Sequence, residues 1–325
     1  MTRRFEISVQ TILFAASLIA GVWLLLQIKD ILFLVFIAFL LMTAIFPMVQ
    51  LLERFKVPRA IGTVLIYVVV LGTLGFIVGS AIPELVSQST KLAQTLQGTV
   101  ARVLPYWSID FQSISGQLAP LSANVLALTV GIFTNILTTF TVLFITFYFV
   151  LERGHAESIL TGFLGGTSGR KVTELLRMIE IRLGAWVRGE LLLMSFVGVL
   201  TYIGLTILHM EFALPLAIIA ALLEIVPMIG PIISAVPAVL IALSISPIFA
   251  VTVAILYIIV QQIENNIFIP LVWRHSLGLS PLVTILALMI GSRLGGIGGA
   301  IVAVPLVLVL QVVLTTFLST KTPSS

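Results

Sequence analysis

The feature that most constrains this chain is an uncharged run of 39 residues, from Ile225 to Ile263, that contains four prolines. A single membrane helix needs about 20 apolar residues, so this run is too long for one helix. Each proline inside a helix also removes a backbone hydrogen bond. In lipid an unpaired backbone group costs several kcal/mol, so broken backbone persists only where protein buries it or where it lines a wet cavity. Interrupted membrane segments form the binding sites of many transporters, and the run therefore predicts a membrane transport protein.

The composition supports a membrane protein. Apolar residues make up 59% of the 325 residues and charged residues 9%, and the mean hydropathy is +1.22. A soluble domain carries about 25% charged residues. The chain has no cysteine, which excludes disulfides and thiolate metal sites. The net charge of +4 comes from short basic clusters beside apolar runs, which is a signal of membrane topology rather than of nucleic-acid binding. We expect no nucleic-acid partner, no metal and no cofactor.

The uncharged runs predict an all-α polytopic membrane protein that forms a single integral membrane domain over residues 1–325. The predicted spans lie near residues 9–26, 31–52, 60–82, 122–151, 191–208, 213–243, 247–263 and 281–318. Two further segments carry apolar residues at helical spacing among polar ones. They are predicted to be amphipathic surface helices docked on the bundle, within residues 83–121 and 152–190.

The basic residues predict the orientation. Most of the 17 Lys and Arg residues fall on one face if each of the first five runs crosses the membrane once. The positive-inside rule assigns that face to the cytoplasm. Both termini, the loop at residues 53–59 and the segment 152–190 are then cytoplasmic, and residues 83–121 are external.

Two parts of the C-terminal half form a weak internal repeat. Residues 215–223 resemble residues 281–289, a Gly/Pro-rich break follows each, and each recovers with the tripeptide Ala-Val-Pro. We expect two helix–break–helix hairpins, either re-entrant from opposite faces or built from complete spans. The predicted break residues are Pro227, Gly230 and Pro231 in the first hairpin, and Gly295, Gly296, Gly298 and Gly299 in the second.

Ionisable side chains within this apolar region are the candidate functional residues, because each costs at least ~2.5–3.5 kcal/mol at membrane depth. Glu224 directly precedes the first break, and Arg293 lies within the second. The helix between the breaks ends in a polar group: Gln261, Gln262, Glu264, Asn265 and Asn266. One interpretation places all of them around a cavity, where Glu224 carries a coupled proton or cation and the others bind a polar solute. The alternative is a structural Glu224–Arg293 pair that bridges the two hairpins, with Glu264 at the membrane interface.

Catalytic motifs do not support an enzyme. Gly166-Thr-Ser-Gly169 matches the pattern of serine intramembrane proteases, but it lies in a charged segment and no span carries a histidine to activate Ser168. Residues 165–171 approach a P-loop, with a spacing one residue too short. We expect no catalytic activity.

Four motifs carry a resemblance to a known family. They are Glu224-Ile-Val-Pro-Met-Ile-Gly-Pro231, Glu264-Asn-Asn-Ile-Phe-Ile-Pro270, Leu279-Ser-Pro281 and Gly295-Gly-Ile-Gly-Gly-Ala-Ile-Val-Ala-Val-Pro305. Together they resemble the C-terminal signature of the autoinducer-2 exporter (AI-2E) family of bacterial permeases. The resemblance covers essentially the whole chain, although the N-terminal half matches only in hydropathy and in its long external segment.

The resemblance implies a secondary transporter of the bacterial inner (plasma) membrane that exports a small polar metabolite, with the quorum-sensing signal autoinducer-2 as one candidate. Some halophile members of the family are linked instead to sodium or lithium exchange for protons, so a monovalent cation/proton antiporter is the first alternative. A membrane scaffold without transport is the second. The resemblance also implies a homo-oligomer, with a pentamer as one option. The sparse intramembrane carboxylates favour the solute exporter over the antiporter.

Overall fold

The computed structural model describes residues 9–73, 75–76, 91, 136–227, 229–273 and 279–319, which form helices joined by short turns. The labelled elements are α1 (Val9–Gln27), α2 (Lys29–Arg54), α5 (Ile136–Leu164), α6 (Gly166–Ile207), α7 (Ala213–Leu223), α8 (Ile229–Ile245), α9 (Pro247–Ile263), η2 (Glu264–Phe268), α10 (Ile269–Trp273) and α11 (Pro281–Ser319). A further apolar helix spans Arg59–Thr73. Five helices in the described ranges are long and apolar enough to cross a membrane. The prediction of an all-α polytopic membrane protein is confirmed, while the predicted external segment 83–121 lies outside the described residues except for Lys91.

The long helix α6 differs from the segmentation expected from sequence. The predicted boundary between a cytoplasmic segment ending at residue 190 and a span starting at residue 191 falls inside a continuous helix of 42 residues. Buried side chains recur along α6 at three- and four-residue spacing, which is the pattern of one helix face. They are Ile179, Leu183, Trp186, Glu190, Leu193, Val197, Thr201 and Leu205. This unbroken stripe explains why the helix does not end where its charged residues do.

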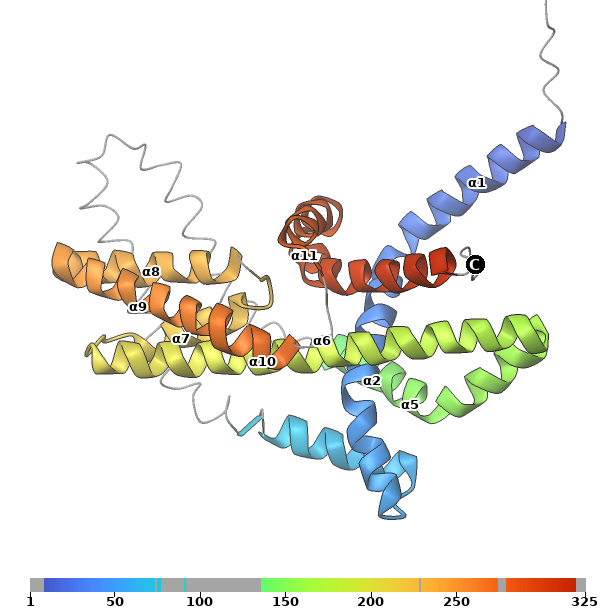
Figure 1. Ribbon diagram of the computed structural model, residues 1–325, viewed down its shortest axis with the longest axis horizontal. Coiled ribbons are helices and arrows are strands. Elements are labelled where there is room, and N and C mark those ends of the chain that lie inside the picture. The colour runs from blue at the N-terminus through green and yellow to red at the C-terminus, as the bar shows by residue number, and fades with distance from the viewer. Residues whose placement is uncertain are drawn as a thin grey trace, which may run out of the picture.

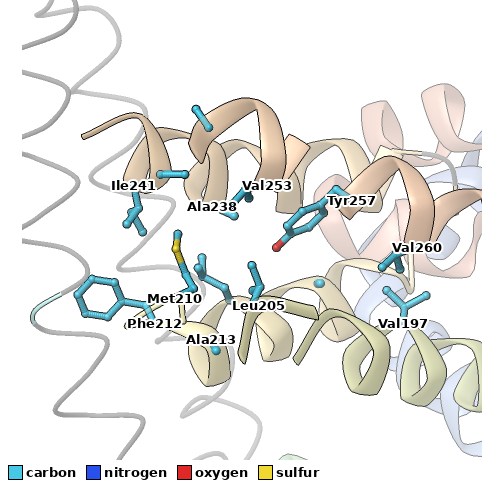
Figure 2. Packing of buried hydrophobic residues seen from close by; sticks show 14 residues of the cluster. Val197, Leu205, Met210, Phe212, Ala213, Ala238, Ile241, Val253, Tyr257 and Val260 are labelled. Atoms are coloured by element: carbon cyan, nitrogen blue, oxygen red, sulfur yellow. The ribbon is translucent and has the colours of Figure 1, made fainter. Parts of the chain in front are cut away.

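Helix α6 organises the fold because other helices pack against both of its halves (Figure 1). Its C-terminal half packs against α7 and α9, and α8 pairs with α9. Figure 2 shows this cluster, in which Leu205 of α6 faces Val253 and Tyr257 of α9. The N-terminal half packs against α2, α5 and α11. There, the buried Leu183 and Trp186 share a core with apolar side chains of α11.

The crossing of α6 over α2 depends on a glycine and a proline. A Cβ atom on Gly184 would lie 2.4 Å from the carbonyl oxygen of Thr43, so no larger residue fits there. Pro47, inside α2, has no N–H to donate to that carbonyl oxygen four residues earlier. Arg188 Nη1 donates to it instead, over 3.2 Å, and lies 3.4 Å from the oxygen of Ala44. Helix α6 thus satisfies the acceptor that Pro47 leaves unpaired.

Both predicted hairpins are interrupted where the Gly/Pro breaks fall. In the first, α7 ends at Leu223 and α8 begins at Ile229, and a Cβ atom on Gly230 would lie 2.0 Å from the oxygen of Leu223. In the second, α11 bends at Gly295 and at Gly296, whose φ of 60° is a left-handed conformation that favours glycine.

The lengths of the hairpin arms bear on how they sit in a membrane. Helix α7 has 11 residues, which is about 16 Å at 1.5 Å per residue. The hydrocarbon core of a bilayer is about 30 Å thick. Helix α7 is therefore too short to cross it alone, which favours a re-entrant first hairpin. The membrane position of both hairpins stays a prediction.

Candidate functional site

Three buried glutamates come together where α6, the first helix break and η2 meet. Glu190, Glu224 and Glu264 expose only 3%, 1% and 6% of their surfaces. The carboxyl groups of Glu224 and Glu264 lie within hydrogen-bonding reach of each other. Glu190 is close enough to both for a direct charge–charge interaction. We call these residues the three-glutamate cluster.

The first helix break positions Glu224. Its backbone N–H still donates to the oxygen of Ala220, so Glu224 closes the last turn of α7. Pro227 then follows, and α8 starts at Ile229. The close packing of Gly230 on Leu223 holds the two helices together at this point. The break therefore fixes Glu224 at a buried helix end rather than on a helix surface.

Glu264 opens a short stretch of π-helix between α9 and α10. The N–H of Ile269 donates to the oxygen of Glu264, five residues earlier. Such turns are rare and occur frequently at functional sites, because the extra residue moves neighbouring side chains to new positions on the helix.

The three glutamates have no basic partner among the described residues. The ion pairs among the described residues are Arg59–Glu53 and Arg153–Glu180, neither of which involves the cluster. Both carboxyl oxygens of Glu190 and the Oε2 atoms of Glu224 and Glu264 have no hydrogen-bond partner in the described part of the chain. Buried unpaired polar atoms mark places for a water, an ion or a proton.

The other predicted pathway residues lie elsewhere. Gln261 is half-buried, whereas Gln262, Asn265 and Asn266 are exposed. Asn266 Nδ2 donates within its own helix to the oxygen of Gln262 over 2.8 Å and to its Oε1 over 3.1 Å. The three exposed amides thus occupy a different side of the helix from the buried Glu264.

Arg293 is exposed near the bend of α11, and no described carboxylate forms an ion pair with it. The structure therefore does not bring Arg293 to Glu224. The partner of Glu224 is Glu264, and not Arg293 as in the alternative of a structural Glu224–Arg293 pair.

Sequence analysis missed Glu190. Six Lys and Arg residues lie between 152 and 190, and this charge predicts a cytoplasmic segment of which Glu190 is the last residue. The available signal was its spacing: Glu190 lies four residues after Trp186 and three before Leu193, within the buried stripe of α6. A carboxyl group inside an apolar stripe is unusual and marks a candidate site.

The arrangement can hold a proton. A hydrogen bond between two carboxyl groups requires a proton on one of them, and adjacent buried carboxylates without a cation are strongly unfavourable. Groups of three or more metal ligands at coordinating distances are absent from the described residues. A shared proton, by contrast, requires only the contact between Glu224 and Glu264.

Broken apolar helices with buried, unpaired ionisable groups define a class of protein, the polytopic membrane transporters. Residues 12–319 match the AI-2E family of transporters, and the chain belongs to this family.

Relatives along nearly the whole chain carry names of the same kind. Two Bacillus subtilis proteins are named "Putative transport protein", YueF and YrrI. YueF is 31% identical over 92% of this chain and 88% of its own length. YrrI is 29% identical over 89% of this chain and 86% of its own length. YhhT of Escherichia coli is 36% identical over a shorter stretch, 37% of this chain and 35% of the relative.

Proposed function

We propose that this transporter is a proton-coupled secondary transporter of the bacterial inner membrane that exports a small polar metabolite, with autoinducer-2 as a candidate solute. The observation that carries the proposal is the buried contact between Glu224 and Glu264, which has Glu190 beside it and no basic partner among the described residues.

The coupling follows from the chemistry of this contact. With one proton present, the two carboxyl groups attract each other through a hydrogen bond; without it, two negative charges repel. Glu224 lies at the break between α7 and α8, and Glu264 lies in η2. Loss of the proton therefore favours an arrangement in which these segments separate. A ligand shifts a conformational equilibrium only through such differential stabilisation of two states.

The exposed polar residues support a solute path. Gln262, Asn265 and Asn266 lie on or next to a helix that is apolar enough to span the membrane, and Arg293 lies within another. Polar side chains that face lipid are costly, so such residues usually face a water-filled cavity or another protein surface. We propose that they contact the solute, and that a second copy of this chain in a homo-oligomer, of which a pentamer is one form, covers part of this face.

A monovalent cation/proton antiporter is the second candidate, favoured by one observation. Both oxygens of Glu190 are buried and unpartnered beside two other carboxyl groups. A sodium or lithium ion held by these oxygens could replace the proton, and the cluster would then carry the transported ion itself.

Purified protein in liposomes tests both candidates. Autoinducer-2 and Na⁺ are loaded into separate vesicle preparations, and a pH gradient is imposed on each. The proposal predicts that the gradient accelerates release of autoinducer-2 and not of Na⁺. Acceleration of Na⁺ release alone would replace the exporter by the antiporter. If the pH gradient accelerates release from neither preparation, both coupled-transport hypotheses are excluded, and a membrane scaffold without transport remains.

A further inference from the structure

The π-helical stretch that presents Glu264 ends at an aromatic contact with α6. Phe268, its last residue, stacks on Phe196, with ring centroids 4.1 Å apart and an angle of 16° between the rings. Both rings are partly buried. Phe268 comes four residues after Glu264, so the two side chains lie on the same side of their helix.

This stack connects two parts of the three-glutamate cluster. Phe196 lies on α6, fewer than two turns after Glu190. The stack therefore fixes η2, and Glu264 with it, against the helix that carries Glu190. Glu264 also contacts Glu224 at the end of α7, which packs on the same helix. Helix α6 thus positions all three carboxyl groups, either by carrying the residue or by packing against the element that carries it.

Hydrogen bonds alone do not favour the π-helical conformation. Such turns are short and rare, whereas the α-helix that continues on both sides has the regular i→i−4 bonds. A relaxation of this stretch to α-helix would change the rotational position of Glu264 relative to Phe268. Side-chain packing therefore has to stabilise the π-helical turn. The Phe196–Phe268 stack, at the last residue of this turn, is a contact that can do so.

We propose that Phe196 and Phe268 are positioning residues that hold Glu264 in hydrogen-bonding contact with Glu224. This inference rests on the proposed function, because the contact matters only if the two carboxyl groups share a proton. The stack is the contact through which the long helix α6 holds η2, and with it Glu264, in place.

Infrared spectroscopy of the full-length protein in lipid vesicles tests this link without a transported solute. A protonated carboxyl group gives a carbonyl band, and hydrogen bonding to a second carboxyl moves that band to lower frequency. The band of the shared proton is identified by its loss or shift in Glu224→Gln and in Glu264→Gln, because each variant removes one of the two carboxyl groups that share it. Phe268→Ala is then compared with Phe268→Tyr, which keeps a ring, and with Ile267→Ala, a matched control on an exposed side chain of the same turn.

We expect Phe268→Ala to shift the band to the higher frequency of an isolated carboxyl group, and Phe268→Tyr and Ile267→Ala to leave it in place. An unshifted band in folded Phe268→Ala would overturn the positioning role and leave the proposed function standing. A band that stays unchanged in both Glu224→Gln and Glu264→Gln would instead overturn the shared proton, and both proposals with it. If Phe268→Ala does not fold, Phe196→Leu, which removes the ring but keeps apolar bulk, decides by the same criteria.

Discussion

Glu224 precedes α8 and Glu264 directly follows α9, and their carboxyl groups meet in a buried site. Helix α8 leads away from Glu224, and α9 returns to Glu264. The two helices pack against each other, so the α8–α9 pair starts and ends near the carboxyl contact. A change in the protonation of this contact therefore acts where the α8–α9 pair joins the rest of the protein. A small separation of the two carboxyl groups there moves both helices.

The missed residue Glu190 provides the first prediction. Glu190→Gln removes the titratable carboxyl group beside the shared proton while it preserves size and most hydrogen-bonding capacity. We expect the variant to fold and to reach the membrane, but its pH-gradient-driven release of autoinducer-2 should fall at least tenfold in liposomes. Glu174→Gln, an exposed position on the same helix, is the matched control and should retain the full rate. Equal rates in both variants would limit the proton site to Glu224 and Glu264.

The crossing of α2 and α6 provides a prediction about stability. Arg188→Met leaves the buried oxygen of Thr43 without its donor, which should cost about 1–3 kcal/mol in free energy of unfolding. Pro47→Ala restores an N–H within α2 that can bond the same oxygen. The cost of Arg188→Met should therefore be smaller in the Pro47→Ala background, as measured by unfolding in mixed detergent micelles.

This double-mutant cycle isolates the interaction that we assign to the pair. If Arg188→Met costs the same with Pro47 and with Ala at that position, the arginine does not act through the carbonyl that the proline leaves free.

The glycines of α11 provide a third prediction. A Cβ atom on Gly299 would lie 2.0 Å from the oxygen of Gly291, a backbone atom that cannot move aside. Gly299→Ala should therefore destabilise the fold by about 1–3 kcal/mol or prevent its assembly. Gly298→Ala should cost less, because its Cβ would meet the ring of Phe33 at 3.2 Å, and a side chain can adjust.

Gly72→Ala is the control, since no atom of the described residues outside its own helix backbone lies within 4 Å of a Cβ atom built there. The thermal stability of the three variants in detergent ranks them. A Gly299→Ala variant as stable as Gly72→Ala would show that the two arms of α11 do not pack as closely as described.

The topology can be tested with single cysteines, because the chain has none of its own. Helix α6 has 42 residues and is about 63 Å long, twice the thickness of the hydrocarbon core. Ser168, at its start, and Glu211, just beyond its end, are both exposed. With a membrane-impermeant thiol reagent on intact cells, Glu211→Cys should label and Ser168→Cys should label only after the cells are opened. Labelling of both from outside would reverse the assignment of cytoplasmic and external faces.

Sequence patterns predicted the helical class and both helix breaks because each depends on local chemistry. A proline such as Pro227 restricts the backbone and a glycine such as Gly230 makes it more flexible, whatever the surrounding fold. A long apolar run predicts a membrane helix from its composition alone. Glu224 and Glu264 stood out for the same reason, as isolated carboxyl groups in apolar surroundings.

The partners of these residues were harder to predict, because partnership depends on how helices pack. A Glu224–Arg293 pair follows from the rule that opposite charges attract, but the structure places Glu224 with Glu264 and leaves Arg293 exposed. Glu190 lies among the charged residues of segment 152–190, and only its three- and four-residue spacing from buried side chains indicates that it belongs to the buried stripe of α6. Contacts between distant segments, such as Phe196 with Phe268, leave no pattern in a single sequence.

The proposal that the proton shared by Glu224 and Glu264 drives transport is tested most directly with the Glu224→Gln variant, in which proton coupling and solute movement can be measured separately. Liposomes containing this variant are loaded with autoinducer-2, and two rates are measured: exchange of the solute at equal pH on both sides, and its release under an imposed pH gradient. The account predicts that exchange continues, because the amide can donate the hydrogen bond to Glu264, while acceleration by the gradient is lost. Full acceleration of release by the gradient in Glu224→Gln would contradict the assignment of the coupled proton to this contact.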